Sequence, residues 1–171
     1  MTRLQTAPPE TESHPSPDLF RKVLGHFATG VVAITAIDPE TGQPTGLVAN
    51  SFTSVSLDPP LVAFCVAHTS TSWPKVRAAE RYCINILAEH QEDVSRQMSK
   101  KGAAKFEGLG WSHSPGGSPL LDDAVAWIDA TLEDEHLAGD HHIVVAHVQN
   151  LAAAERSPLL FFRGGYGRLN R

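Results

Sequence analysis

Apolar residues occur along this chain in short runs, and polar turn residues separate one run from the next. Runs that are rich in β-branched residues or that alternate with polar residues are typical of strands, and they lie at 31–37, 46–56, 61–67, 82–87, 125–132, 143–148 and 159–162. The segment 38–42 (DPETG) has the composition of a tight turn, which predicts a hairpin. Strands and helices do not alternate regularly in the sequence. We therefore expect six or seven strands in an antiparallel barrel and not a doubly wound sheet.

Helical spacing of apolar residues is limited to short segments. The first begins after Ser16, a good N-cap, and Gly30 is its natural end; its apolar stripe is formed by Leu19, Phe20, Val23, Leu24 and Phe27. A second short helix is expected after Ser72 and a third over 89–99. Residues 1–15 are rich in Thr, Pro and Glu without periodicity, which predicts a disordered or loosely held arm. The folded domain is therefore expected over 16–171.

The stretch 44–60 (PTGLVANSFTSVSLDPP) differs from an ordinary barrel strand. Its strand-like part, 46–56, has neither charge nor proline, and both of its faces mix apolar residues with small polar ones: Asn50, Ser51, Thr53, Ser54 and Ser56. Such a strand can be buried and still offer amide and hydroxyl groups to a flat ligand with polar edges. A half-exposed strand with surface hydroxyls is the alternative, and the pattern alone leaves both open. The segment 58–60 (DPP) should end the strand.

Two other segments have the composition of an anion site. Residues 69–72 (TSTS) place four hydroxyls before a short helix, where free backbone N–H groups favour negative charge. Simple capping by Ser72 is the alternative for this loop. Residues 100–105 (KKGAAK) are locally basic in an acidic protein. Either these residues form a solvated face, or one of their lysines contacts a phosphate.

Composition narrows the class of protein. The 171 residues suit one domain, and 42% hydrophobic and 19% charged residues are ordinary for a soluble globular protein. A net charge of −5 argues against nucleic acid as a partner. No apolar run has membrane-spanning length, and no apolar leader is recognisable at the N-terminus, so we expect a cytoplasmic protein without a membrane partner. Cys65 and Cys83 lie in apolar runs, which favours buried free thiols over a disulfide or a catalytic thiol.

The familiar catalytic and nucleotide-binding motifs are absent from the sequence. Four histidines are close in sequence, but His141 and His147 would be about 20 Å apart along a strand, and His141 and His142 would point to opposite faces. No metal site is therefore expected, since HExxH and CxxC are also missing. GxSxG, GxGxxG and GxxxxGK[ST] do not occur either, so a hydrolase elbow, a Rossmann fold and a P-loop are not supported. Any nucleotide cofactor would have to be held in another way.

Several segments, in this order, resemble one known family. They are FRKVLGHFATGVVAIT (20–35), GLVANSFTSVSLDPPLVAFCV (46–66), STSWPKVR (70–77), YCINIL (82–87), KFEG (105–108), GDHHIVVAHV (139–148) and PLLFFRGGYGRL (158–169). The chain is similar over about 17–168 to the flavin reductase domain, the FMN-binding split-barrel family. Members serving aromatic or steroid hydroxylases are the most similar in these segments. Together, the ANSFTSVSLDPP and GDH segments are quite specific for it.

The resemblance implies a mostly β protein with short helices, built as a six-stranded antiparallel split barrel of the Greek-key type. It also implies a homodimer that uses NADH or NADPH to reduce FMN or FAD by hydride transfer. The reduced flavin would diffuse to a separate flavin-dependent monooxygenase. Two rivals share the barrel: a non-catalytic flavin or haem carrier, and an enzyme like pyridoxamine-phosphate oxidase. The GDH segment and the LDPP turn favour the reductase over both.

The resemblance also implies which residues form the site. Those expected to bind the flavin are Thr45, Gly46, Val48, Ala49, Asn50, Ser51, Cys65, Val66, Ala67, Thr71, Ser72, Lys105 and Phe106. Those expected near the nicotinamide are His141, Phe162, Arg163, Gly164 and Tyr166. His141 is also the expected catalytic residue, orienting the nicotinamide or assisting a proton. Gly165 departs from the bulkier or charged residue of many members, and neither His142 nor His147 is given a role in binding or catalysis. Ser54 and Ser56 are expected to close the barrel or to face a second subunit.

Overall fold

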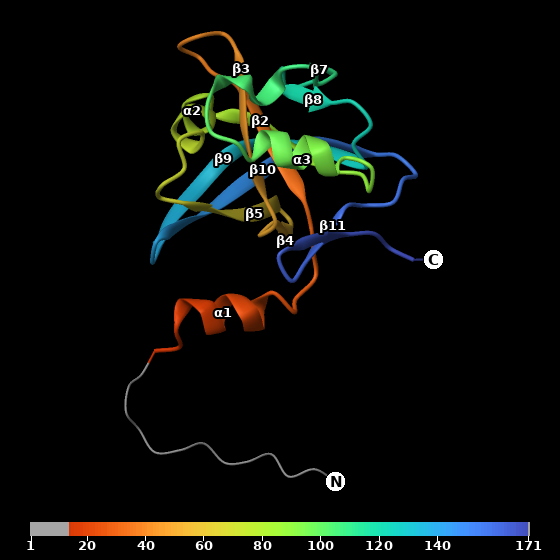
Figure 1. Ribbon diagram of the computed structural model, residues 1–171. Coiled ribbons are helices and arrows are strands. Elements are labelled where there is room, and N and C mark those ends of the chain that lie inside the picture. Colours follow the sequence, from red (N-terminus) through yellow and green to blue (C-terminus); the bar gives the residue numbers. More distant parts are fainter. Residues whose placement is uncertain (1–13, 171) are drawn as a thin grey trace, which may run out of the picture.

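The body of the protein is one curled antiparallel sheet (Figure 1). The computed structural model describes residues 14–170, so the expected arm over 1–15 lies outside the described residues except for its last two. The seven strands, in the spatial order β3-β2-β6-β9-β10-β5-β4, are β3 (Pro44–Ala49), β2 (Val32–Ile37), β6 (Arg81–Ile86), β9 (Ala126–Ala138), β10 (His141–Ala153), β5 (Pro60–Ala67) and β4 (Thr53–Leu57). The prediction of a mostly β, antiparallel fold is confirmed.

The sheet closes on itself, because β3 and β5 contact each other although they are not neighbours in the strand order. Ser51, just after β3, makes this contact specific. Its hydroxyl accepts a hydrogen bond from the Cys65 N–H (2.8 Å) and lies 3.3 Å from the Cys65 carbonyl oxygen. The strands are joined here by a side chain and not by a backbone ladder, which leaves the barrel split along this seam.

Two smaller sheets and four short helices surround the barrel. The sheets pair β7 (Trp111–His113) with β8 (Pro119–Leu121), and β11 (Leu160–Phe162) with β1 (Thr29–Gly30) and β12 (Gly165–Gly167). The helices are α1 (Pro17–Leu24), α2 (Trp73–Ala78), α3 (Glu92–Met98) and the 3₁₀ helix η1 (Ala103–Phe106). Within residues 14–170, no helix is long and apolar enough to cross a membrane.

The core has two parts that lie on opposite faces of β2. Inside the barrel, Ile34 packs with residues of the other strands: Phe64, Tyr82, Ile84 and Val144. On the outer face, Ala33 packs with residues from α3, η1, β8 and the segment just before β11: Met98, Phe106, Leu121 and Leu159. Burial on both faces explains why β2 is a continuous apolar run rather than an alternating one.

Two expectations from the sequence are wrong in detail. The run 46–56 is not one strand: β3 ends at Ala49 and β4 begins at Thr53, and the chain turns between them so that Ser51 can reach β5. The first helix ends at Leu24, with Gly25 as its C-cap, and Phe27 lies beyond it.

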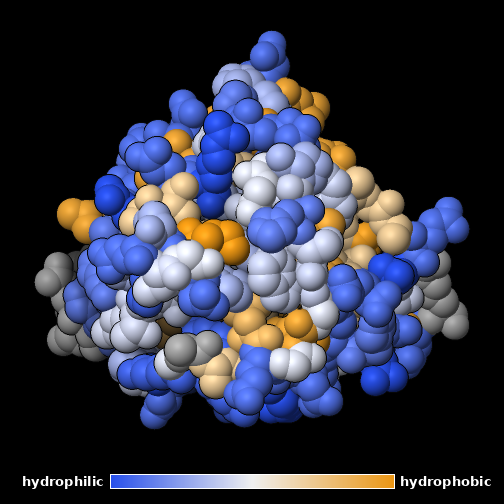
Figure 2. Space-filling model, turned by 90° about the horizontal axis from the view of Figure 1, so that it is seen from above, coloured by the Kyte–Doolittle hydropathy of each residue, from blue (hydrophilic) through white to orange (hydrophobic). Residues whose placement is uncertain are grey.

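Helix α1 lies apart from the rest of the molecule (Figure 1), and none of its residues is buried. Its apolar stripe is exposed: Leu19, Phe20, Val23 and Leu24 are 51–57% accessible, and Phe27 is 74% accessible. The opposite end of the molecule is different, since most residues there are hydrophilic and the apolar ones form small separate groups (Figure 2). The exposed apolar stripe of α1 therefore has no counterpart on that end.

Candidate functional site

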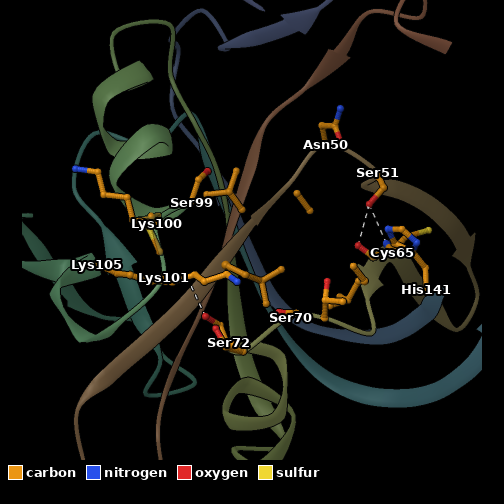
Figure 3. A pocket seen from close by; sticks show the side chains of 18 residues that line it. Asn50, Ser51, Cys65, Ser70, Ser72, Ser99, Lys100, Lys101, Lys105 and His141 are labelled. Atoms are coloured by element: carbon orange, nitrogen blue, oxygen red, sulfur yellow. Dashed lines mark hydrogen bonds between the residues drawn. The ribbon is translucent and has the colours of Figure 1, made fainter. Parts of the chain in front are cut away.

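A cleft of about 390 Å³ lies at the split of the barrel, between the ends of β3 and β5. Four segments form its walls: 47–51, 65–67, 69–72 and the basic segment after α3, with His141 at the start of β10. Figure 3 shows Asn50, Ser51, Cys65 and His141 at one end of the cleft and the lysines at the other. The cleft thus has a mixed apolar and amide end and a cationic end.

Lys105 is the buried lysine at the cationic end of the cleft. Its side chain is buried, and Nζ donates hydrogen bonds to the Gly46 carbonyl oxygen (3.0 Å) and to the Ser72 hydroxyl (2.8 Å). Burial lowers the pKa of Lys105 from its usual value, because the charged form loses water. Within residues 14–170, no carboxylate forms an ion pair with it. A buried ammonium with two neutral acceptors and one unused proton fits an anionic group such as a phosphate.

The alternative for the hydroxyl loop, simple capping of α2 by Ser72, is not what the structure shows. The Ser72 side chain makes no capping hydrogen bond, and it accepts from Lys105 instead. Ser70 takes over part of the capping, since its Oγ accepts from the Trp73 N–H at 3.2 Å. The Ser72 hydroxyl and Lys105 therefore form one polar unit at the floor of the cleft.

Glu135 on β9 holds the position of this loop. Its two carboxylate oxygens accept from Trp73 Nε1 (2.8 Å) and Arg77 Nε (2.7 Å), both on α2. His142 Nδ1 lies 3.3 Å from the same carboxylate. Burial alone would raise the pKa of Glu135, but the hydrogen bonds from Arg77 and Trp73 outweigh it and lower the pKa. The sequence did not single out Glu135, because its partners are about 60 residues away.

The substitution Glu135→Gln should destabilise the protein near neutral pH and weaken the effect of acid on stability. Because the folded-state pKa is below the usual 4.5, the contribution of Glu135 is complete above pH 4.5 and is lost as pH falls through the lowered pKa. We expect a loss of about 1–2 kcal/mol in the free energy of unfolding at pH 7. Urea titrations from pH 3 to 7 measure this, with Glu133→Gln, at an exposed neighbouring position, as the control. Equal effects of the two substitutions would contradict the clamping role of Glu135.

His141 lies at the other end of the cleft, and its partner is the preceding residue. His141 Nδ1 is 2.7 Å from Asp140 Oδ1. This hydrogen bond, together with the charge of His141, lowers the pKa of Asp140. An ionised carboxylate only accepts hydrogen bonds, so Nδ1 is the nitrogen that keeps its proton. Nε2 is then the atom available to a ligand.

The structure brings most of the expected site residues to this cleft. Those that line it are Val48, Ala49, Asn50, Ser51, Cys65, Val66, Ala67, Thr71, Ser72, Lys105 and His141. Thr45 and Phe106 line a neighbouring cavity instead, and Gly46 contributes its carbonyl oxygen to Lys105. Seven further residues line the cleft that the expected flavin contacts did not include: Leu47, Thr69, Ser70, Met98, Ser99, Lys100 and Lys101. Four of them had a signal in the sequence, because Thr69 and Ser70 belong to the hydroxyl loop 69–72 and Lys100 and Lys101 to the locally basic run.

The four other residues expected near the nicotinamide do not line the cleft. Phe162 lies on β11, Arg163 and Gly164 form the turn that follows it, and Tyr166 lies on β12. The Tyr166 hydroxyl is 2.8 Å from Ser95 Oγ on α3. The Tyr166 side chain therefore connects the small sheet to α3, the helix that precedes the basic segment.

Both cysteines are free, as expected. Cys83 is buried on β6, and burial raises the pKa of its thiol to about 12. Cys65 is half-buried and lines the cleft. The Cys83 thiol therefore stays protonated and has a structural role in the core.

Comparison with known proteins decides the family. The flavin reductase like domain matches residues 24–170. This chain belongs to that family. A flavin reductase from Pseudomonas putida is 49% identical over 152 residues, which are 88% of this chain and 89% of the relative. The flavin-dependent monooxygenase reductase subunit HsaB of Mycobacterium tuberculosis is 42% identical over 153 residues, 88% of this chain and 81% of the relative.

A solved structure has the same fold. The NADH:FAD oxidoreductase SgcE6 of Streptomyces globisporus, in complex with NAD and FAD fragments, superposes with a TM-score of 0.85 at 30% identity. The match covers 91% of this chain and 93% of that structure. Family membership and fold therefore agree with the resemblance found in the sequence.

Proposed function

We propose that this protein oxidises NADH or NADPH and reduces FMN or FAD, and that it supplies the reduced flavin to a separate monooxygenase. The observation that supports this most is the buried Lys105, a cation without a carboxylate partner in the described part of the chain, at the end of a cleft of about 390 Å³ that has a mixed apolar and amide end. The flavin accepts a hydride from the nicotinamide when both are bound. The chain itself has to bind and orient the two ligands and to exclude water from them.

Each part of the cleft has a task in this proposal. The Ser72 hydroxyl and Lys105, with Thr71 beside them, hold the phosphate of the flavin. The flat ring lies against the ends of β3 and β5, where Asn50 and backbone groups can contact its polar edge. Cys65, Val66 and Ala67 form the wall beside it. The assignments of Phe162, Arg163, Gly164 and Tyr166 to the nicotinamide stay a prediction.

His141 is proposed to orient the nicotinamide through Nε2, with Asp140 fixing the ring by its hydrogen bond to Nδ1. Hydride transfer needs stacking of the two rings more than it needs an acid or a base. His141→Ala should therefore lower kcat/KM for NADH by about tenfold without abolishing turnover. A tenfold decrease is the effect expected from the loss of one oriented hydrogen bond. Stopped-flow reduction of bound flavin measures it. An unchanged rate of flavin reduction would remove the role of His141.

We further propose that the protein is a homodimer in which the apolar stripe of α1 packs against a second copy. Exposed Phe27 follows the stripe in sequence, and no residue of the stripe is buried within the described chain. Phe20→Asp should then convert the dimer to monomer, because a charge would be buried in the interface. Light scattering after size-exclusion chromatography measures this, with Lys22→Asp on the polar side of α1 as the control. A wild-type protein that is monomeric at micromolar concentration would contradict the proposal.

The reducing cytoplasm is the proposed location, and the two free cysteines support it. A partner monooxygenase is proposed because the HsaB relative is the reductase subunit of a flavin-dependent monooxygenase. Purified protein, mixed with NADH or NADPH and with FMN or FAD, tests the function through the loss of nicotinamide absorbance. Sustained oxidation with at least one flavin is expected. Loss of one equivalent per protein would indicate a flavin carrier, and no loss with either flavin would refute the proposal.

A further inference from the structure

The hydroxyl loop 69–72 is held at both of its ends by side chains that do not line the cleft. Trp73 directly follows the loop, and its Nε1 donates a hydrogen bond to Glu135 Oε1 on β9 (2.8 Å). His68 directly precedes the loop, and the centroid of its ring lies 4.4 Å from that of His142 on β10. The position of the loop therefore depends on contacts made outside the cleft.

His142 has different surroundings from His141, its neighbour on β10. Adjacent residues of a strand point to opposite faces of the sheet, and His141 is the one that lines the cleft. His142 shares its face with Val144, which belongs to the core of the barrel, and Val144 is paired with Glu135 in the β9–β10 register. His142 Nδ1 accordingly lies 3.3 Å from Glu135 Oε1.

One carboxylate thus connects the two ends of the loop. Glu135 Oε1 contacts Trp73 directly, and it contacts His142, which in turn lies against His68. The other oxygen, Oε2, accepts a hydrogen bond from Arg77 Nε at 2.7 Å. An ionised carboxylate has about four acceptor sites, so it can take all three contacts at once.

Fixing the loop in advance matters because much of it is exposed. His68, Thr69 and Thr71 are exposed, while Ser72 is buried and accepts from Lys105. A loop that becomes ordered only when the ligand binds reduces affinity by the conformational entropy that it loses. Contacts that order the loop beforehand remove this cost without touching the ligand.

We propose that His142 is a positioning residue for the phosphate of the flavin: it is oriented by Glu135, packs against His68, and so orders the hydroxyl loop before the flavin binds. This inference rests on the proposed function, which takes the loop as the phosphate site. His142→Ala should weaken FMN binding by about fivefold, the cost of ordering one side chain of the loop. Riboflavin has no phosphate, so its affinity should stay unchanged.

The test compares dissociation constants of FMN and riboflavin for wild type, His142→Ala, His68→Ala and the double variant. His68→Ala should have the same effect as His142→Ala, and the double variant should bind FMN no more weakly than either, because all three lack the same contact. His142→Phe keeps a ring beside His68 and should recover part of the affinity. His136→Ala is the control, since His136 is exposed next to Glu135 and lies 3.2 Å from Asp134; it should change neither ligand.

Riboflavin binding also shows whether each variant keeps a folded cleft. An equal loss for FMN and riboflavin in His142→Ala would mean general structural support and would overturn the inference, as would unchanged FMN affinity. Additive losses in the double variant, or no recovery in His142→Phe, would also contradict it, because the two rings would then not act through their contact. Failure of wild type to bind either flavin would instead refute the proposed function itself.

Discussion

Lys105→Met is expected to weaken FMN binding by about 100-fold, the value of one or two charge-assisted hydrogen bonds to a phosphate. The methionine side chain keeps about the length of lysine but removes the cation that, among the described residues lining the cleft, is alone in being buried. Riboflavin, which has the same ring without a phosphate, should bind to wild type and variant equally well. Titration of flavin fluorescence with each protein measures both ligands.

The same experiment separates a phosphate contact from damage to the cleft. Lys105→Arg keeps the charge and should recover part of the FMN affinity, although guanidinium geometry differs from that of an ammonium. An equal loss for riboflavin and FMN would mean that Lys105 only supports Gly46 and Ser72. FMN affinity should also fall at alkaline pH, as the lowered pKa of Lys105 is passed, and riboflavin affinity should not.

Gly46→Ala is expected to lower the free energy of unfolding by about 2 kcal/mol, as overpacking of a well-packed core does. A Cβ at Gly46 would lie 2.7 Å from the Ile34 carbonyl oxygen on β2 and 2.9 Å from Met98 Cε on α3. Because the first contact is with backbone, β3 has to move. The Gly46 carbonyl accepts from Lys105, so FMN affinity should fall together with stability.

Gly30→Ala is the matched control for this substitution, because a Cβ there meets no atom within 4 Å. Its effect on the free energy of unfolding should stay within about 0.5 kcal/mol, as for other surface positions. Chemical denaturation of the three proteins measures the difference. Equal stability of Gly46→Ala and wild type would show that the packing of β3 against β2 and α3 is looser than the distances indicate.

Local sequence patterns predict most strands of the seven-stranded sheet, because each of these strands has β-branched residues. They do not predict where β3 ends. The break at Asn50 serves a tertiary contact, the hydrogen bond from the Cys65 N–H to Ser51 Oγ, which no local pattern encodes. For helix α1, the spacing of apolar residues predicts the helix, but it does not predict that these residues are exposed.

The candidate site, too, was predicted only in part from the sequence. The residues on β3, β5 and the hydroxyl loop were found through the family resemblance, and most of them line one cleft. Glu135 was missed because its role depends on pairing β9 with β10 and on packing α2 beside them. Of the four C-terminal residues expected at the nicotinamide, Phe162 and Tyr166 lie on a separate small sheet and Arg163 and Gly164 form the turn between its strands. The Tyr166 hydroxyl contacts Ser95 and not the cleft.

The central claim is that the cleft reduces flavin repeatedly and releases it. The most direct measurement mixes a catalytic amount of protein, without oxygen, with an excess of NADH and of FMN or FAD, and follows the visible absorbance of the flavin. The account predicts that many equivalents of flavin are bleached per protein, with one NADH consumed for each, and that Lys105→Met slows this at low FMN. Bleaching that stops after one equivalent per protein, or that does not occur with either flavin, would contradict it.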